Sequence, residues 1–474
     1  MMMKSLFLLL FLLLLCGCFK NGDNFSTLND YARTFDSIRK VQLKSRDFLT
    51  LAEARELALA NNPTLLAAAN SIHSAQYSYY RSLSAWSPEI SASWEVGNTL
   101  SQGNDLRHPP PGIFERENRF STSGTLSMTW LLFNGLAREL DILVAKLEYD
   151  RSIAAAEDVK RLLLRAVVYV WCDIHLATEE ISIFQADEAF QNAALRQAQE
   201  QFKAGHISYA AVLNFKVLSA KARSRIELAG YHRQTAVNAL AALLGYNAKE
   251  FPADIKLEAV TSPRMELHHP LEYYLEQAIR HRPDLRSEKL QFEKSIREKQ
   301  SAYADFMPEF HLFADFDFAA EASRYREHGI VSSHYNTPQF AYGIVGKWNI
   351  FRGFDSWNEL RRKKALEKVA FRGLNKKYLD VTVEVNDALE HCRNTLIQIS
   401  IFREMALWVL EERNLIYSEY LNGRETIARV NQAQSELVEA QSSLVLWVIQ
   451  SRKAFAQFQA ALGTDTVIKN ERQE

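Results

Sequence analysis

Cysteine is scarce in this sequence of 474 residues, and that scarcity excludes a fold held together by disulfides. Only four cysteines are present, and Cys16 and Cys18 stand in an apolar N-terminal run. Cys172 and Cys392 lie in helical stretches and have no second ligand at a metal-binding spacing. We therefore expect two buried free thiols rather than a disulfide.

Net charge and internal hydrophobic runs are lacking as well. The formal net charge of -1 indicates neither nucleic-acid binding nor a polybasic membrane patch. A mean hydropathy of -0.22 argues against a bundle of transmembrane helices. The motifs HExxH, GxSxG, the P-loop and paired CxxC are also missing, so we expect no enzyme, no cofactor and no metal. The adjacent His268 and His269 more often mark a solvated loop than a metal site.

The one long apolar run is at the N-terminus and resembles a bacterial lipoprotein leader. Lys4 precedes the apolar stretch 6–15, and Gly17 stands before Cys18 as in a lipobox. We predict a signal peptide over 1–17, a lipidated Cys18 and a linker over 18–49. An uncleaved anchor helix is the alternative.

The chain repeats itself after about 220 residues. TLAEARELALANNPTL at 50–65 matches PLEYYLEQAIRHRPDL at 270–285, and WSPEI matches FMPEF, both at an offset of 220. LFNG matches IFRG, FKAG matches YLNG and ALLG matches AALG, all at an offset of 218. The preserved order predicts two equivalent units. They span 50–246 and 270–463, with a Pro-bearing connector over 247–269 and a tail over 464–474.

Each unit is predicted to contain two β-strands, at about 89–97 and 120–133 in the first and about 309–318 and 339–351 in the second. Polar and apolar residues alternate there, and polar loops over 98–112 and about 322–338 join the strands. The apolar face carries aromatic and aliphatic side chains, among them Trp94, Leu126, Met128, Trp130, Phe316, Tyr342 and Trp348.

This alternation suits a soluble sheet packed on helices as well as a membrane barrel. Strand length and interfacial aromatics favour the barrel, with the apolar face toward lipid. Four strands cannot close a barrel, and lipid offers no hydrogen bonds to an open edge. Several chains must then share one barrel.

Long helical arms follow the strands in both units. They span 137–203 and about 207–244, then about 354–421 and 425–462, without an internal proline. At 1.5 Å per residue, the first arm is about 100 Å long. Gly205 and Gly423 lie between the arms at positions suited to helix C-caps. The fold class is therefore α+β, with long helical hairpins, although a soluble bundle would show the same periodicity.

Taken together, these segments resemble the TolC family of bacterial outer-membrane efflux proteins. The matching segments are ALANNPTL and AIRHRPDL, SPE and MPE, LFNG and IFRG, the Gly-bearing tips, and the closing LLG and ALG. The resemblance covers roughly residues 50–463. It implies a homotrimer in which each chain gives four strands to a twelve-stranded barrel, continued by a helical tunnel across the periplasm.

The resemblance also implies location, partners and sites. It places the chain in the outer membrane of a Gram-negative-type bacterium, as a passive channel for efflux or type I secretion. The partners would be a periplasmic adaptor and an inner-membrane pump, either an RND transporter or an ABC transporter. We expect the hairpin tips to dock such a partner through Gly205, His206, Gly423 and Arg424. A lipid-anchored periplasmic coiled-coil scaffold without a pore is the alternative function.

The sequence departs from well-known family members after the second tip glycine. Acidic residues line the closed aperture there, whereas this chain has Arg429 and Gln432. We hypothesise a less cation-selective or even basic aperture, with Tyr420 and Arg424 as candidate members of a gate network. The alternative is that Arg429 pairs with a neighbouring glutamate on a solvated helix face.

Overall fold

The computed structural model describes residues 48–104, 114–247, 251–252, 254–259, 267–325 and 333–463. All of them belong to one compact unit of the chain. The predicted signal peptide, Cys18 and the C-terminal tail lie outside the described residues. None of the helices that the structure describes combines the length and the hydropathy needed to span a bilayer.

The two halves of the described chain run through the same elements in the same order. The first half comprises α3 (Leu51–Asn61), α4 (Pro63–Leu83), the 3-10 turn η1 (Ser84–Trp86), β2 (Glu89–Asn104), β3 (Phe114–Phe133), α5 (Ala137–Lys203) and α6 (Tyr209–Leu243). The second comprises α7 (Leu271–His281), α8 (Pro283–Ser301), η2 (Ala304–Phe306), β5 (Glu309–Tyr325), β6 (Ser333–Lys347), α9 (Asp355–Leu421) and α10 (Ile427–Leu462). The sequence did not predict a small parallel pair of β1 (Phe48–Leu49) and β4 (Lys256–Leu257).

Helix boundaries follow from capping residues and prolines. The hydroxyl of Thr50 accepts a hydrogen bond from the Glu53 amide (3.2 Å) and thereby caps α3. Asn62 separates α3 from α4, and its side chain accepts from two amides in the first turn of α4. Pro63 follows at the first position of α4, where its missing N–H costs nothing.

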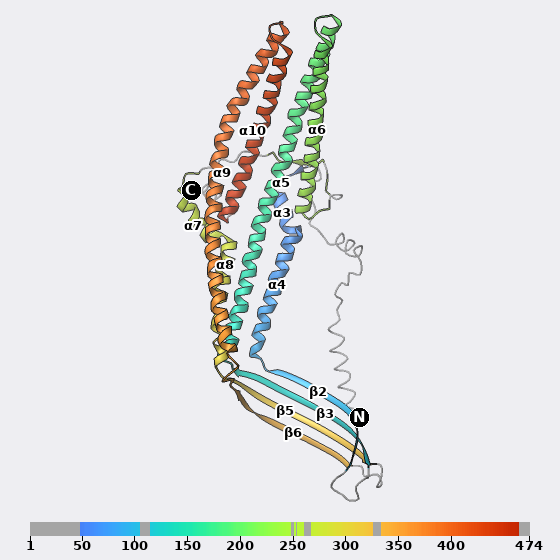
Figure 1. Ribbon diagram of the computed structural model, residues 1–474, viewed down its shortest axis with the longest axis vertical. Coiled ribbons are helices and arrows are strands. Elements are labelled where there is room, and N and C mark those ends of the chain that lie inside the picture. Colours follow the sequence, from blue (N-terminus) through green and yellow to red (C-terminus); the bar gives the residue numbers. More distant parts are fainter. Residues whose placement is uncertain are drawn as a thin grey trace. The chain divides into compact units, whose positions relative to one another are not determined.

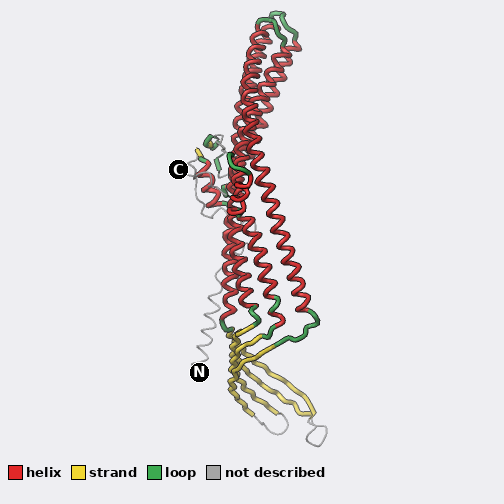
Figure 2. The backbone as a smooth tube through the Cα atoms, turned by 90° about the vertical axis from the view of Figure 1, so that its left-hand side faces the viewer, coloured by secondary structure: helices red, strands yellow, loops and turns green. Residues whose placement is uncertain are grey.

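Two helical hairpins stand side by side, and the sheet lies at the opposite end from their tips (Figures 1 and 2). The first hairpin is α5–α6 and the second is α9–α10. Both α5 and α9 have 67 residues, which corresponds to about 100 Å of helix. Each of these two helices therefore links a sheet strand to a distant hairpin tip.

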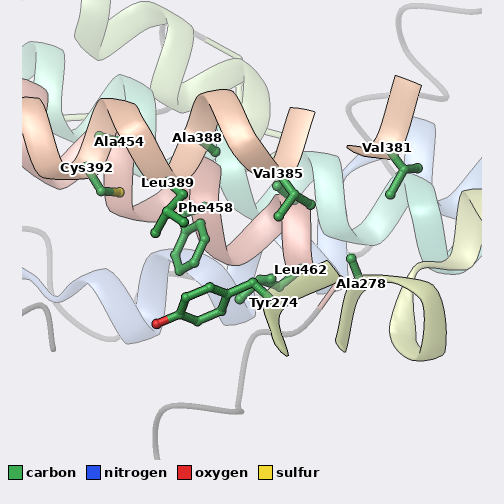
Figure 3. Close-up of a cluster of buried hydrophobic side chains, with 11 residues drawn as sticks. Tyr274, Ala278, Val381, Val385, Ala388, Leu389, Cys392, Ala454, Phe458 and Leu462 are labelled. Atoms are coloured by element: carbon green, nitrogen blue, oxygen red, sulfur yellow. The ribbon is translucent and has the colours of Figure 1, made fainter. Parts of the chain in front are cut away.

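The hydrophobic core lies partway along the hairpins. Figure 3 shows Tyr274 and Ala278 of α7 packed against α9 and α10. The rings of Tyr274 and Phe458 meet edge to face, with centroids 5.0 Å apart. Cys392 belongs to this cluster and Cys172 to a neighbouring one. Both thiols are free and buried, as predicted, and burial raises the pKa of each to about 12.

The sheet is antiparallel, with strand order β2-β3-β5-β6. Its strands are longer than predicted at the loop ends, because backbone pairing continues beyond the residues whose polarity alternates. The predicted loops 98–112 and 322–338 were therefore too long, and only 105–113 and 326–332 separate the strands. At its other end β6 stops at Lys347, not 351. Its partner β5 begins at Glu309, after a proline that has no N–H to donate.

Candidate functional site

One face of the sheet is apolar and largely exposed. Leu126 lies opposite Phe316, and Tyr342 pairs through Ala314 with Met128, so these side chains project from the same face. Trp94 and Tyr342 are each 75% exposed. Trp130 also belongs to this face, whereas Trp348 lies just beyond the end of β6. The structure thus groups the predicted strand residues on one surface, with Trp348 at its margin.

The opposite face of the sheet is polar. Thr125 donates a hydrogen bond to Asp317 (2.7 Å) across the β3–β5 pair. Asp315 and Glu95 occupy other positions of the same face, and Arg119 forms an ion pair with Glu321 (3.1 Å). A sheet with one apolar face and one charged face separates two different surroundings.

Two left-handed corners join the strands to the helices. Gly135 and Leu136 have φ angles of 69° and 66°, and Gly353 and Phe354 have φ angles of 61° and 70°. A side chain in this region costs about 1–2 kcal/mol, so both corners carry local strain. The predicted strand-to-helix corners therefore exist in both halves.

The first corner is held by an arginine that the sequence did not single out. The guanidinium of Arg138 lies 3.5 Å from the centre of the Trp86 ring and donates to the Leu131 carbonyl (2.7 Å). The indole of Trp130 donates to the Trp86 carbonyl (2.9 Å). At the second corner Trp348 donates to the Phe306 carbonyl (3.2 Å).

The hairpin tips are exposed turns that require glycine. Gly205 and Gly423 have φ angles of 78° and 72°. At the first tip the His206 amide donates to the Gln201 carbonyl (2.9 Å), and at the second the Arg424 amide donates to Glu419 (3.0 Å). These are Schellman caps, which reverse the chain within a few residues. The four tip residues predicted for docking all lie in these turns.

The candidate aperture residues make contacts within and between the hairpins. Arg429 forms an ion pair with Glu412 of α9 (2.7 Å), as in the alternative considered for this residue. The amide of Gln432 donates to Glu436 (2.9 Å) on its own helix. Tyr420 packs against the cluster formed by Ile416, Val430 and Ala433. Its hydroxyl donates to Gln201 of the first hairpin (3.4 Å).

A buried polar cluster links the first hairpin to the second. Asp187 of α5 accepts hydrogen bonds from Gln191 (3.3 Å) and from Gln434 of α10 (2.9 Å). All three side chains are at least 94% buried. Burying a carboxylate without hydrogen-bond donors costs free energy, and a shift of α10 along α5 would take Gln434 away from Asp187. The cluster therefore favours one alignment of α5 against α10.

A larger charged network binds the end of α10. The Arg282 side chain is 2% exposed, and it donates to Asp284 (2.7 Å), Glu384 (2.7 Å) and the Ala461 carbonyl (3.0 Å). Arg161 of α5 donates to the neighbouring Ala460 carbonyl. Burial alone would raise the pKa of Asp284, but hydrogen bonds from Arg282 and from a lysine of α9 outweigh it and lower that pKa.

The first half has a simpler counterpart. Asn62 occupies the position equivalent to Arg282, and its amide donates to the Leu243 carbonyl near the end of α6 (2.9 Å). The sequence offered no signal for the hydrogen bonds to the ends of α6 and α10, since their partners are 179 to 299 residues apart.

The arrangement offers no constellation for catalysis in the part of the chain that the structure describes. No group of three or more His, Cys, Asp or Glu side chains there could hold a metal ion. His269 stacks on Tyr273, with ring centroids 4.3 Å apart. The thiols have raised pKa values and are buried, so they are poor nucleophiles.

Residues 54–246 match the family model of the outer membrane efflux proteins. This match covers the first of the two repeated halves and shows that this half is similar to that family. No curated protein sequence matches the chain. Among solved structures, the outer-membrane channel OprN is similar at a TM-score of 0.74 and 17% identity, with 87% of this chain and 89% of OprN covered.

Two further channels share the fold. The Campylobacter jejuni outer membrane channel CmeC gives a TM-score of 0.75 at 14% identity, covering 96% of this chain and 93% of CmeC. The Vibrio cholerae outer membrane protein VceC gives 0.71 at 17% identity, covering 87% and 96%. These three outer-membrane proteins thus share with this chain the mostly helical architecture and its small sheet.

Proposed function

We propose that this chain is the passive outer-membrane channel of a tripartite efflux or type I secretion system. Substrates would pass from an inner-membrane pump and a periplasmic adaptor through the channel and across the outer membrane. The observation that carries the proposal is the sheet with its exposed apolar face. Its strands β3 and β6 lead into the long helices α5 and α9, and these helices end in exposed tips. The match of residues 54–246 to the efflux-protein family model and the shared fold support it.

In this proposal three copies of the chain close one barrel. Each copy contributes four strands, and the described part of a single chain leaves β2 and β6 each with an unpaired edge that a neighbouring copy would cover. Trp94, Leu126 and Tyr342 face lipid, and Asp315 and Asp317 face water. A lipidated Cys18 anchors the N-terminus, and the helices extend into the periplasm. The tips at Gly205 and Gly423 dock the adaptor, which works with an RND or ABC transporter.

The deciding experiment uses the full-length protein expressed in a Gram-negative host. We expect it in the outer-membrane fraction, extractable only with detergent, as a trimer by light scattering and with conductance in planar bilayers. The pore-free scaffold makes the opposite prediction. After removal of the lipid it would remain soluble and monomeric without detergent, and it would carry no current.

The aperture is proposed to lie near Tyr420, Arg429 and Gln432. The ion pair with Glu412 balances the charge of Arg429, which stands where the family resemblance leads us to expect an acidic residue. Arg429→Ala should shift single-channel selectivity toward cations, and Glu412→Gln should shift it toward anions. If neither substitution changes selectivity, this stretch does not form the aperture.

A further inference from the structure

Among the residues that the structure describes, the outer edges of β2 and β6 have no strand partner, because these strands stand at the two ends of the sheet order. Lipid cannot satisfy the backbone groups of such edges. The β2 strand of a second copy could pair with β6 of the first copy, so that the apolar faces of the two sheets lie on the same side. The inference below rests on the proposed function, which places several copies around one sheet.

The internal repeat offers a rule for transferring contacts from one half to the other. Ala137 and Asp355, which begin α5 and α9, are 218 residues apart, while Pro63 and Pro283, which begin α4 and α8, are 220 apart. Residues of the first half from α3 to β2 have their equivalents 220 positions later in the second half. Residues from β3 to α6 have their equivalents 218 positions later.

One strand pairing within the chain checks this rule. Glu89 of β2 lies opposite Thr129 of β3. Adding 220 and 218 gives Glu309 and Lys347, and these two residues do lie opposite each other in the β5–β6 pair. The offsets therefore transfer a strand register without adjustment.

The same rule applied to the β3–β5 pair predicts a contact between two copies. Ser127 lies opposite Asp315, and the equivalents of these residues are Val345 of β6 and Glu95 of β2. On the other face, Leu126 opposite Phe316 becomes Ile344 opposite Val96. Ile344 and Val96 are 65% and 58% exposed in the single chain, so this pairing covers apolar surface that is open there.

The helices beside the strands give a second, independent agreement. Ser301 of α8 donates to Asp141 of α5 (3.0 Å), and the equivalents are Arg81 of α4 and Glu359 of α9. These residues carry opposite charges. Arg81 is exposed, and Glu359 is partly exposed and pairs with Arg362 of its own helix. A second copy placed by the rule would bring Arg81 toward Glu359.

The corner at Gly135 is packed against other residues of the chain, whereas the corner at Gly353 has free space that a second copy could fill. A Cβ added to Gly135 would meet Ala304 and Met307 at 2.9–3.0 Å, whereas a Cβ on Gly353 meets nothing within 4 Å. The equivalents of Ala304 and Met307 are Ser84 and Ser87. The second corner is thus open where the first one is packed against the next half.

We propose that β6 of one copy pairs with β2 of the next in one register, with Val345 opposite Glu95 of the second copy. In this register Lys347 lies opposite Ser93 and diagonal to Glu95. Arg81 of the second copy lies beside Glu359, and its Ser84 and Ser87 fill the space at Gly353. The partner surface is therefore the start of the repeat on another copy of the same chain.

Cysteine cross-linking of the full-length protein in detergent tests the register. Opposite Cβ atoms lie about 4.5–5.5 Å apart and diagonal ones about 7–8 Å, whereas a disulfide needs about 3.5–4.5 Å. The variant Glu95→Cys/Val345→Cys should form covalent trimers on oxidation, in clearly higher yield than the diagonal pairs. Those matched pairs combine Val345→Cys with Ser93→Cys or with Gly97→Cys. The buried native thiols should not react.

The outcomes separate this inference from the proposed function. A displaced pair that cross-links best overturns the register, and so does a preparation that is trimeric by light scattering but forms no cross-link in any pair. A preparation that is monomeric and carries no current rejects the proposed function as well.

A charge exchange tests the helical contact without new cysteines. Arg81→Glu and Glu359→Arg should each reduce the fraction of SDS-resistant trimer severalfold, and the double variant should restore it. Arg280→Glu is the matched control, because Arg280 pairs with Glu276 on its own helix and should leave the trimer unchanged. If the double variant is no better than the single ones, Arg81 and Glu359 do not meet.

Discussion

Replacing Arg282 with methionine should destabilise the second hairpin far more than the equivalent change destabilises the first. Methionine keeps much of the apolar stem of Arg282 but removes every hydrogen bond that its guanidinium donates. Asp284, about 10% exposed, would lose one of its two partners at 2.7 Å, and the Ala461 carbonyl at the end of α10 would lose the hydrogen bond from Arg282. The change therefore weakens the pairing of the buried Asp284 carboxylate and removes a hydrogen bond from the buried Ala461 carbonyl.

The expected magnitude follows from this loss. Removing one member of a buried ion pair costs about 3–5 kcal/mol of the free energy of unfolding. Arg161 and Lys377 remain near Asp284, at 3.7 Å and 2.7 Å, so the lower end of this range is expected. The matched control is Asn62→Ser, which keeps a helix-capping side chain but removes the bond to Leu243. One such hydrogen bond is worth about 0.5–1.5 kcal/mol.

The assay is guanidinium unfolding in detergent, followed by circular dichroism at 222 nm on the purified full-length variants. Arg282→Met should lower the unfolding midpoint by clearly more than Asn62→Ser. In the double variant Arg282→Met/Asp284→Asn, the loss should be smaller than the sum of the two single losses, because both residues belong to one network. Equal effects of Arg282→Met and Asn62→Ser would refute the reasoning.

Three further predictions concern the tip, the core and an acidic side chain. Gly423→Ala should cost about 1–2 kcal/mol at the left-handed tip and speed amide exchange there, whereas Gly230→Ala inside α6 should be neutral or stabilising. The Cys172 thiol, with its pKa raised to about 12 by burial, should resist maleimide at pH 8 until the protein is unfolded; rapid labelling of the folded protein would contradict this. Hydrogen bonds, first from Arg151 and then from Lys294, lower the pKa of Glu148 from 4.5 to about 2. The stability that Glu148 contributes should be complete above pH 4.5 and disappear as the pH falls toward 2, and unfolding midpoints of Glu148→Gln should show a weaker acid dependence.

The long helices and the strand faces could be predicted from the sequence because each depends on a local pattern. The arm predicted over 137–203 coincides with α5, since nothing interrupts it between the corner at Gly135 and the turn at Gly205. Strand faces follow from a period of two, so Trp94 and Tyr342 were assigned to one face correctly. Strand ends were wrong where polarity stops alternating but backbone pairing continues.

Contacts between distant segments could not be predicted in the same way. Periodicity says which side of α5 is buried, but not that Asp187 meets Gln434, which is 247 residues away. The stacking of Arg138 on Trp86 likewise depends on how the strand and the helix meet at the corner. For Arg429 the sequence left two readings, and the position of Glu412 on the neighbouring helix shows the ion pair.

The loops that join the strands of the two hairpins differ in length. Nine residues, 105–113, connect β2 to β3, whereas seven, 326–332, connect β5 to β6, and the offset between the halves changes from 220 to 218 at this point. Evolution has therefore changed the length here without disturbing either strand register or any helix. An epitope or a fluorophore-binding tag inserted into 105–113 should leave assembly intact, and antibody access to it on living cells would report which side of the membrane this loop reaches.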